Sequence, residues 1–149
     1  MRDLPPVRHR VLVALSPEQA FELFTQGIAR WWPFKSHSCA GESTLDVLFE
    51  PRVGGNVTEL ARDGVRHAWG VLTAWEPPLH FAMAWHPGQS PDRATALSVR
   101  FLAVEGGCEV ALEHSGWSAC GDDAAAARNS YDEGWVYVIG RYARAAQGT

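Results

Sequence analysis

Alternating hydrophobic and polar positions predict a strand followed directly by a helix near the start of the chain. Residues 7–15 alternate with one mainly apolar face, as a half-buried strand does. Ser16 then stands where a helix N-cap is expected, so a helix is predicted over residues 17–25. A second short helix is predicted over residues 28–31, and Pro33 ends it.

The middle of the chain consists of short apolar runs separated by turn residues. Residues 62–64 and 106–107 are glycine-containing turns between two such runs, a spacing typical of β-hairpins. Strands joined in series by short turns predict an antiparallel meander. The predicted strands cover residues 45–50, 56–61, 65–76, 79–86, 94–104 and 108–117.

A long amphipathic helix is predicted after residues 121–123 and ends near Ala146. The order of elements predicts a single α+β domain over residues 1–149 with a helix-grip fold. In this fold a curved antiparallel sheet of six to seven strands wraps around the long C-terminal helix, with two short helices after the first strand. The apolar stripe of the helix comprises Ala127, Tyr131, Trp135, Val138, Ile139 and Tyr142.

Period-two alternation also predicts which strand side chains face the long helix. This inward face is strongly aromatic and carries few polar groups, namely Glu59, His67 and His114, with Tyr131 contributed by the helix. Such a face fits an apolar cavity with convergent polar groups, and it fits a filled aromatic core equally well. The expected inward apolar residues include Val65, Trp69, Val71, Trp75, Leu79, Phe81, Met83, Trp85, Leu97, Val99 and Phe101.

The composition of the chain argues against several classes of function, namely nucleic-acid binding, binding to anionic lipid and spanning a membrane. The chain has seven tryptophans among 149 residues, so large aromatic rings must either fill the core or line a cavity. A net charge of −4 argues against a nucleic-acid partner or an anionic lipid surface. No apolar run is long enough to span a membrane, and the first residues lack the apolar core of a signal peptide, so a cytoplasmic location is expected.

Two inward polar residues are the main candidates for chemistry. Glu59 and His114 would form a general acid–base couple if they met in an apolar cavity. The alternative is an internal hydrogen bond that orients the last strand. His37 and Cys39 lack further ligands at zinc-site spacing, so neither a metal nor a cofactor is expected. Of the adjacent Trp31 and Trp32, one is expected to pack inward and the other either to cover a pocket mouth or to anchor the structure.

Several segments together resemble the START-like (SRPBCC) superfamily of helix-grip ligand-binding domains. Within it, they resemble the group named after the activator of a heat-shock-chaperone ATPase. The resemblance covers about residues 7–143, and the segment 69–85 is its most specific part. The segments are SPEQAFELFT at 16–25, WWP at 31–33, PRVGG at 51–55, the stretch 59–64, WGVLTAWEPPLHFAMAW at 69–85, LEHSGW at 112–117 and YDEGWVYVI at 131–139.

The resemblance implies a pocket between sheet and long helix that binds a small hydrophobic or amphipathic ligand. Two alternatives stay open: a chaperone-associated or stress-response module, and a cofactor-free cyclase, dehydratase or hydrolase using Glu59 and His114. The eukaryotic chaperone activator carries a further N-terminal domain, so chaperone contact is not expected here, whereas a homodimer is possible. The residues expected to contact the ligand are Trp32, Phe49, Glu59, Trp69, Phe81, Trp85, Phe101, His114, Tyr131 and Trp135.

Overall fold

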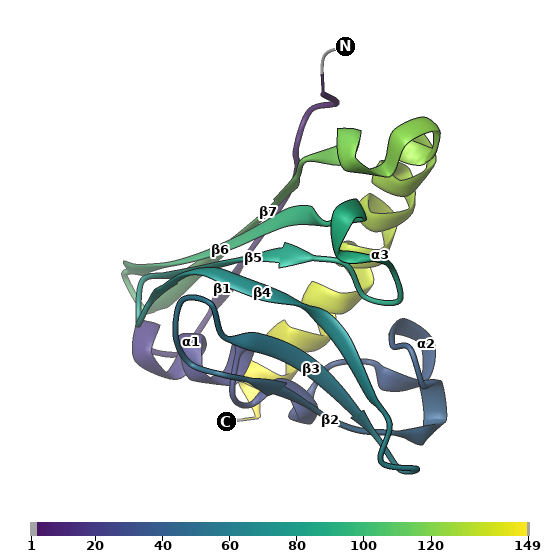
Figure 1. Cartoon of the computed structure of the whole chain (residues 1–149). Coiled ribbons are helices and arrows are strands. Elements are labelled where there is room, and N and C mark those ends of the chain that lie inside the picture. The colour runs from purple at the N-terminus through teal and green to yellow at the C-terminus, as the bar shows by residue number, and fades with distance from the viewer. Residues whose placement is uncertain (1–2, 149) are drawn as a thin grey trace.

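A seven-stranded antiparallel sheet forms the body of the protein (Figure 1). The computed structural model describes residues 3–148. The strands lie side by side in the order β1-β7-β6-β5-β4-β3-β2, so the chain runs as a meander from β2 to β7 and β1 joins its end. The predicted antiparallel sheet is confirmed. Its strands are β1 Val7–Val13, β2 Thr44–Phe49, β3 Asn56–Ala61, β4 Arg66–Glu76, β5 His80–Trp85, β6 Thr95–Val104 and β7 Gly107–Ser115.

Short helical elements follow β1, as predicted. Helix α1 (Pro17–Phe24) begins with a capping box, in which the Ser16 hydroxyl accepts from the Gln19 N–H and the Gln19 side chain accepts from the Ser16 N–H. Residues 28–30 form only a 3-10 turn, and the next α-helix, α2 (Phe34–His37), lies in a segment expected to be loop. Figure 1 shows α1 and α2 near opposite ends of the strands.

The long helix α3 (Ala124–Gln147) lies across the inner face of the curled sheet (Figure 1). A 3-10 segment, Trp117–Asp123, leads into it from β7. None of the helices within residues 3–148 is both long enough and apolar enough to cross a membrane. Four of the six residues of the predicted stripe are buried, namely Trp135, Val138, Ile139 and Tyr142, whereas Ala127 and Tyr131 are half-buried.

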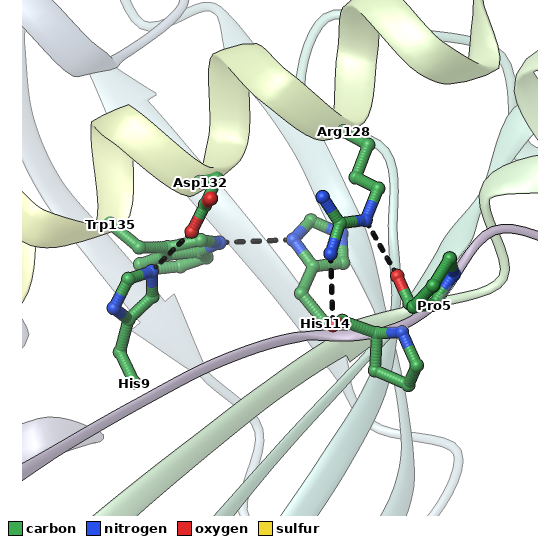
Figure 2. A network of polar contacts seen from close by, with 7 residues as sticks. Pro5, His9, His114, Arg128, Asp132 and Trp135 are labelled. Atoms are coloured by element: carbon green, nitrogen blue, oxygen red, sulfur yellow. Dashed lines mark hydrogen bonds and ion pairs between the residues drawn. The ribbon is translucent and has the colours of Figure 1, made fainter.

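Polar contacts tie the first half of α3 to the first strand (Figure 2). Asp132 of α3 pairs with His9 of β1 at 2.8 Å. One turn earlier, the Arg128 guanidinium donates to the carbonyls of Pro5 and Pro6, at 2.6 and 3.3 Å. These contacts orient α3 along β1, which is an edge strand of the sheet.

Two irregularities in β4 alter the inward face that alternation predicted. The pairing register shifts opposite Val57/Thr58 in β3, and again between Leu72 and Ala74 in β4. Each extra residue reverses the side-chain alternation. As a result Leu72 is buried and Val71 is exposed, the reverse of the prediction. Val65 and Leu79, which alternation also placed inside, are exposed because they lie outside the strands, just before β4 and β5. The expected inward residues of β6 and β7 are buried, as predicted.

Gly70 lies between these irregularities, where β4 and β5 come very close. A Cβ at this position would lie 1.7 Å from the carbonyl oxygen of Ala84. We therefore expect Gly70→Ala to destabilise the fold by about 1–3 kcal/mol, because the strands must separate.

Gly140→Ala in α3 is the control, since its Cβ would meet no heavy atom within 4 Å. That variant should gain about 1 kcal/mol from helix propensity. Urea unfolding measures both, and equal stability of Gly70→Ala and wild type would contradict the close approach.

Candidate functional site

A cavity of about 550 Å³ lies between the sheet, α2 and α3. This volume is in the range of small-molecule sites in proteins. The cavity is bordered by the chain around α2, by strands β4 and β5 with the turn that follows β5, and by the first half of α3. Its lining residues are Trp32, Ser36, His37, Ser38, Cys39, Trp69, Trp85, Pro87, Gly88, Ser130, Tyr131, Gly134, Trp135 and Val138.

Four cavity tryptophans, Trp32, Trp69, Trp85 and Trp135, form the apolar wall. Their rings contact one another, with centroid separations of 5.1 Å for Trp32–Trp69 and 5.5 Å for Trp85–Trp135. Each is at most 6% exposed. The wall is therefore a continuous packed surface rather than a set of independent rings.

Every indole N–H of the four cavity tryptophans is hydrogen-bonded within the protein. Trp32 donates to the His37 carbonyl at 2.8 Å, and Trp85 donates to the Tyr131 hydroxyl at 3.0 Å. Trp69 and Trp135 donate to the side chains of Glu59 and His114, described next. Because these bonds fix the ring orientations, the wall is rigid before any ligand arrives.

Glu59 lies behind the wall and holds the chain that follows α2. Its carboxylate accepts from the N–H groups of Cys39 and Ala40, the Thr44 hydroxyl and the Trp69 indole, at 2.7–2.9 Å. Burial alone would raise the pKa of this carboxyl, but the four donors outweigh burial and the pKa is lowered. Glu59 is therefore an ionised structural anchor with its acceptor positions occupied.

The thiol of Cys39 reaches the cavity beside this carboxylate. Burial, together with the charge of Glu59 and a hydrogen bond to it, raises the pKa of the thiol to about 11. The thiolate is the nucleophilic form of cysteine, so at neutral pH Cys39 presents an unreactive thiol to the cavity.

His114 is fully buried on the other side of the wall (Figure 2). The Trp135 indole donates to Nδ1 at 3.0 Å, so Nδ1 is an acceptor and Nε2 carries the proton. Nε2 then donates to the Thr95 hydroxyl at 2.6 Å, and that hydroxyl donates to the Trp85 carbonyl. Burial lowers the pKa of His114 to about 3. His114 is therefore a neutral strut that joins the main chain of one cavity tryptophan to the side chain of another.

The predicted couple of Glu59 and His114 is wrong. Glu59 lies on β3 and His114 on β7, and the sheet order places β4, β5 and β6 between them. Four strand spacings amount to roughly 19 Å along the sheet. Both side chains face inward, as alternation predicted, but each hydrogen-bonds to a different part of the wall.

The ten residues expected to contact a ligand separate into three groups. The four cavity tryptophans and Tyr131 line the cavity. Glu59 and His114 lie behind its wall. The three phenylalanines expected to face it instead pack in the filled part of the core, against α1 and one another; they are Phe49, Phe81 and Phe101.

Of the adjacent tryptophans, Trp31 packs inward as expected, and Trp32 is buried rather than a cover over the cavity mouth. Trp31 and Trp32 are both buried, at 2% and 6% exposed, so neither covers the mouth from outside. Trp31 packs against Tyr142 and donates to the Leu23 carbonyl, which makes it a core residue. Trp32 is part of the cavity wall.

Sequence reasoning missed most of the polar rim. The rim residues Ser36, Ser38 and Ser130 belong to segments with no strand periodicity, so no local pattern marks them. Gly134 of α3 also lines the cavity, and a glycine inside a helix is a signal that could have marked a close approach or an opening. A Cβ at Gly134 would lie 3.9 Å from Nε2 of His37, an ordinary van der Waals distance, so a longer side chain at this position would extend into the space beside His37. Within residues 3–148, no three His, Cys, Asp or Glu side chains are grouped to hold a metal ion.

The neutral state of His114 makes stability depend on pH. In the unfolded chain the imidazole titrates near its ordinary pKa of 6.5, and in the folded protein near 3. Below pH 6.5 the imidazole is therefore protonated in the unfolded state but stays neutral in the folded state. As a result the free energy of unfolding falls as the pH falls. The loss attributable to His114 should approach about 1.4 kcal/mol per pH unit.

Urea unfolding between pH 7.5 and 5 measures this slope. His114→Gln should lose that part of the slope, and His67→Gln, which removes a half-buried histidine of β4, is the control. NMR titration of the wild-type imidazoles gives an independent readout, because His114 should stay neutral at pH 5. Protonation of His114 in the folded protein above pH 5 would contradict the buried-strut assignment.

Comparison with known proteins places the whole fold among related chains. The family model described as Activator of Hsp90 ATPase homolog 1-like protein matches residues 14–144. The chain is 35% identical to Txn09, an anthrahydroquino-gamma-pyrone synthase solved as a complex, with a TM-score of 0.60; the match covers 89% of this chain and 90% of that one. A comparison with curated proteins gives no match.

Two further solved structures share the fold at lower identity. The Aha1 dimer from Colwellia psychrerythraea is 18% identical with a TM-score of 0.66, and the match covers 96% of each chain. An AHSA1-like protein from Aeromonas hydrophila is 16% identical with a TM-score of 0.67, covering 96% of this chain and 92% of that one. At these identities the likeness shows a common fold and nothing more.

Proposed function

Because the chain belongs to the family of Activator of Hsp90 ATPase homolog 1-like proteins, we propose that its cavity binds a small hydrophobic or amphipathic molecule. The observation that carries this proposal is the wall of four cavity tryptophans around a space of about 550 Å³. These four rings pack against one another, as the rings of the filled core do, but they also border a space.

The wall suits an apolar ligand because it is preorganised. All four indole N–H groups are used within the protein, so the cavity meets the apolar parts of the indoles. A ligand then gains apolar contact without the cost of ordering these side chains. The rim, with Ser36, Ser38 and Ser130, adds hydroxyl groups that suit the polar end of an amphipathic molecule.

Gly134 offers a direct test of occupancy. Gly134→Leu should place an isobutyl group in the opening toward His37, and Gly140→Leu makes the same change on the same helix away from the cavity. The neutral fluorescent probe N-phenyl-1-naphthylamine is titrated against each variant. We expect the wild type and Gly140→Leu to bind it equally, and Gly134→Leu to bind it at least 10-fold more weakly.

Native mass spectrometry of protein purified from cells complements this titration, because a non-covalent adduct lost in Gly134→Leu would identify the ligand class. Equal binding of the naphthylamine probe by both leucine variants would place binding outside the cavity and overturn the proposal. So would a wild-type protein that binds neither the probe nor a cellular molecule.

A second candidate, a cofactor-free cyclisation, is favoured by the 35% identity to the synthase over 89% of this chain. Glu59 and His114 are unsuited to proton transfer, because the first is saturated by donors and the second is neutral and buried. Among the polar residues that line the cavity, His37 carries an imidazole, which can transfer a proton.

This candidate predicts acceleration of a simple ring closure. In o-hydroxydibenzoylmethane the phenol oxygen adds to the distant ketone carbon and water then leaves, which gives flavone. We expect the wild type to accelerate this reaction above buffer, and His37→Gln to lose at least 10-fold of the acceleration while still binding the naphthylamine probe. Absorbance follows flavone formation, and a rate equal to that in buffer would contradict cyclase activity on this substrate class.

A stress-response role and a homodimer stay open alternatives, a cytoplasmic location stays a prediction, and chaperone contact is still not expected. None of them has a structural observation of its own, and the dimer in the comparison belongs to a chain only 18% identical.

A further inference from the structure

Among residues 3–148, the hydroxyl of Tyr131 is a donor without an acceptor. Its oxygen accepts the Trp85 indole N–H at 3.0 Å. Within residues 3–148 the hydroxyl proton itself is given to no other group. Tyr131 is half-buried and lines the cavity, so the vacant acceptor position is one that a ligand can fill.

Neighbouring rings hold Tyr131 in place. Its ring lies 4.6 Å from His114 and 5.8 Å from Trp117, centroid to centroid. On the other side it lies nearly parallel to the ring of Trp135, at 28°. The hydroxyl therefore has a fixed position at the edge of the tryptophan wall.

The Trp85 N–H also improves Tyr131 as a donor. Accepting one hydrogen bond polarises a hydroxyl and strengthens the bond that it donates. Burial raises the pKa of Tyr131, so the proton is retained throughout the physiological range. The cavity therefore presents one strong neutral donor beside an apolar wall.

The charges around the cavity disfavour an anionic ligand. Within the part of the chain that the structure describes, neither an arginine nor a lysine lines it. The nearest buried charge is the carboxylate of Glu59, which lies directly behind Cys39 and Trp69. A carboxylate or phosphate would lose its hydration and meet a like charge without an arginine or lysine of the lining to balance it.

On the premise of the proposed ligand-binding function, we propose that Tyr131 selects a neutral, planar ligand by donating its hydroxyl proton to a ligand carbonyl oxygen. The planar part lies against the tryptophan wall, and the carbonyl is the one polar group that must meet the protein at the Tyr131 edge. The ligand class is thus an aromatic ketone or quinone-like compound without a negative charge.

Three probes that share one ring system test this inference. Xanthone carries the carbonyl, xanthene lacks it, and xanthone-2-carboxylate adds a negative charge. Quenching of tryptophan fluorescence gives the affinity of each. For the wild type we expect xanthone to bind about 10-fold more tightly than xanthene, as one hydrogen bond allows, and xanthone-2-carboxylate to bind more weakly than xanthone.

Three single-residue variants then identify which side chain donates the hydrogen bond to the xanthone carbonyl. Tyr131→Phe keeps the ring contacts and should reduce the preference for xanthone over xanthene to about 1-fold. Tyr137→Phe, which removes a hydroxyl from the same helix outside the cavity lining, should keep the preference. Trp85→Phe removes the other polar hydrogen at this edge and the bond that strengthens Tyr131 as a donor, but it leaves the Tyr131 hydroxyl. The preference for xanthone should therefore be smaller than in the wild type but still present.

Four outcomes of these measurements would overturn the inference. A preference that survives in Tyr131→Phe but disappears in Trp85→Phe would assign the donor to Trp85 and overturn the inference. Equal wild-type affinity for xanthone and xanthene, tighter binding of xanthone-2-carboxylate, or no binding of xanthone would also overturn it. The proposed function would still stand in these cases if the naphthylamine probe binds the wild type and is lost in Gly134→Leu.

Discussion

The concave face of the sheet carries more aromatic surface than one helix can cover, and much of the architecture follows from this constraint. Apolar area exposed to water costs about 25 cal/mol per Å², so each ring must find a cover. At one end α1 supplies it, with Phe21 and Phe24 packed against Phe101 and Phe81 at centroid separations of 5.1 and 5.7 Å. At the other end Trp32 and the chain around α2 supply a looser cover, and there a space of about 550 Å³ is left.

The buried polar residues are explained by the same constraint. A tryptophan that packs inward brings an N–H group that needs an acceptor. Glu59 accepts the N–H of Trp69, His114 that of Trp135, and Tyr131 that of Trp85. Glu59 and His114 therefore hold the tryptophans of the wall in place and do not face a ligand in the cavity. Tyr131 differs from both because its oxygen accepts and its proton is still available to a ligand.

Individual strands show which buried residues the local hydrophobic pattern could predict and which it could not. Strands β6 and β7 have regular registers, so period-two alternation predicted their buried residues correctly. The same rule misplaced Val71, because the irregularities in β4 insert extra residues that no hydrophobic pattern marks. Glu59 and His114 were correctly predicted to face inward, yet facing inward did not bring them together. Their separation depends on strand order, which is a non-local property of the sheet.

The sequence by itself determined the α+β helix-grip fold, the family and the face of each regular strand, because these follow from periodicity, turn chemistry and ordered motifs. Only the tertiary structure decided which aromatic rings border a cavity and which fill the core. Phe81 and Trp85 lie on the same face of the same strand, yet the first packs against α1 and the second lines the cavity. The physical reason is that a cavity is the volume left after segments distant in the sequence have packed together. The residues of a single strand do not determine that volume.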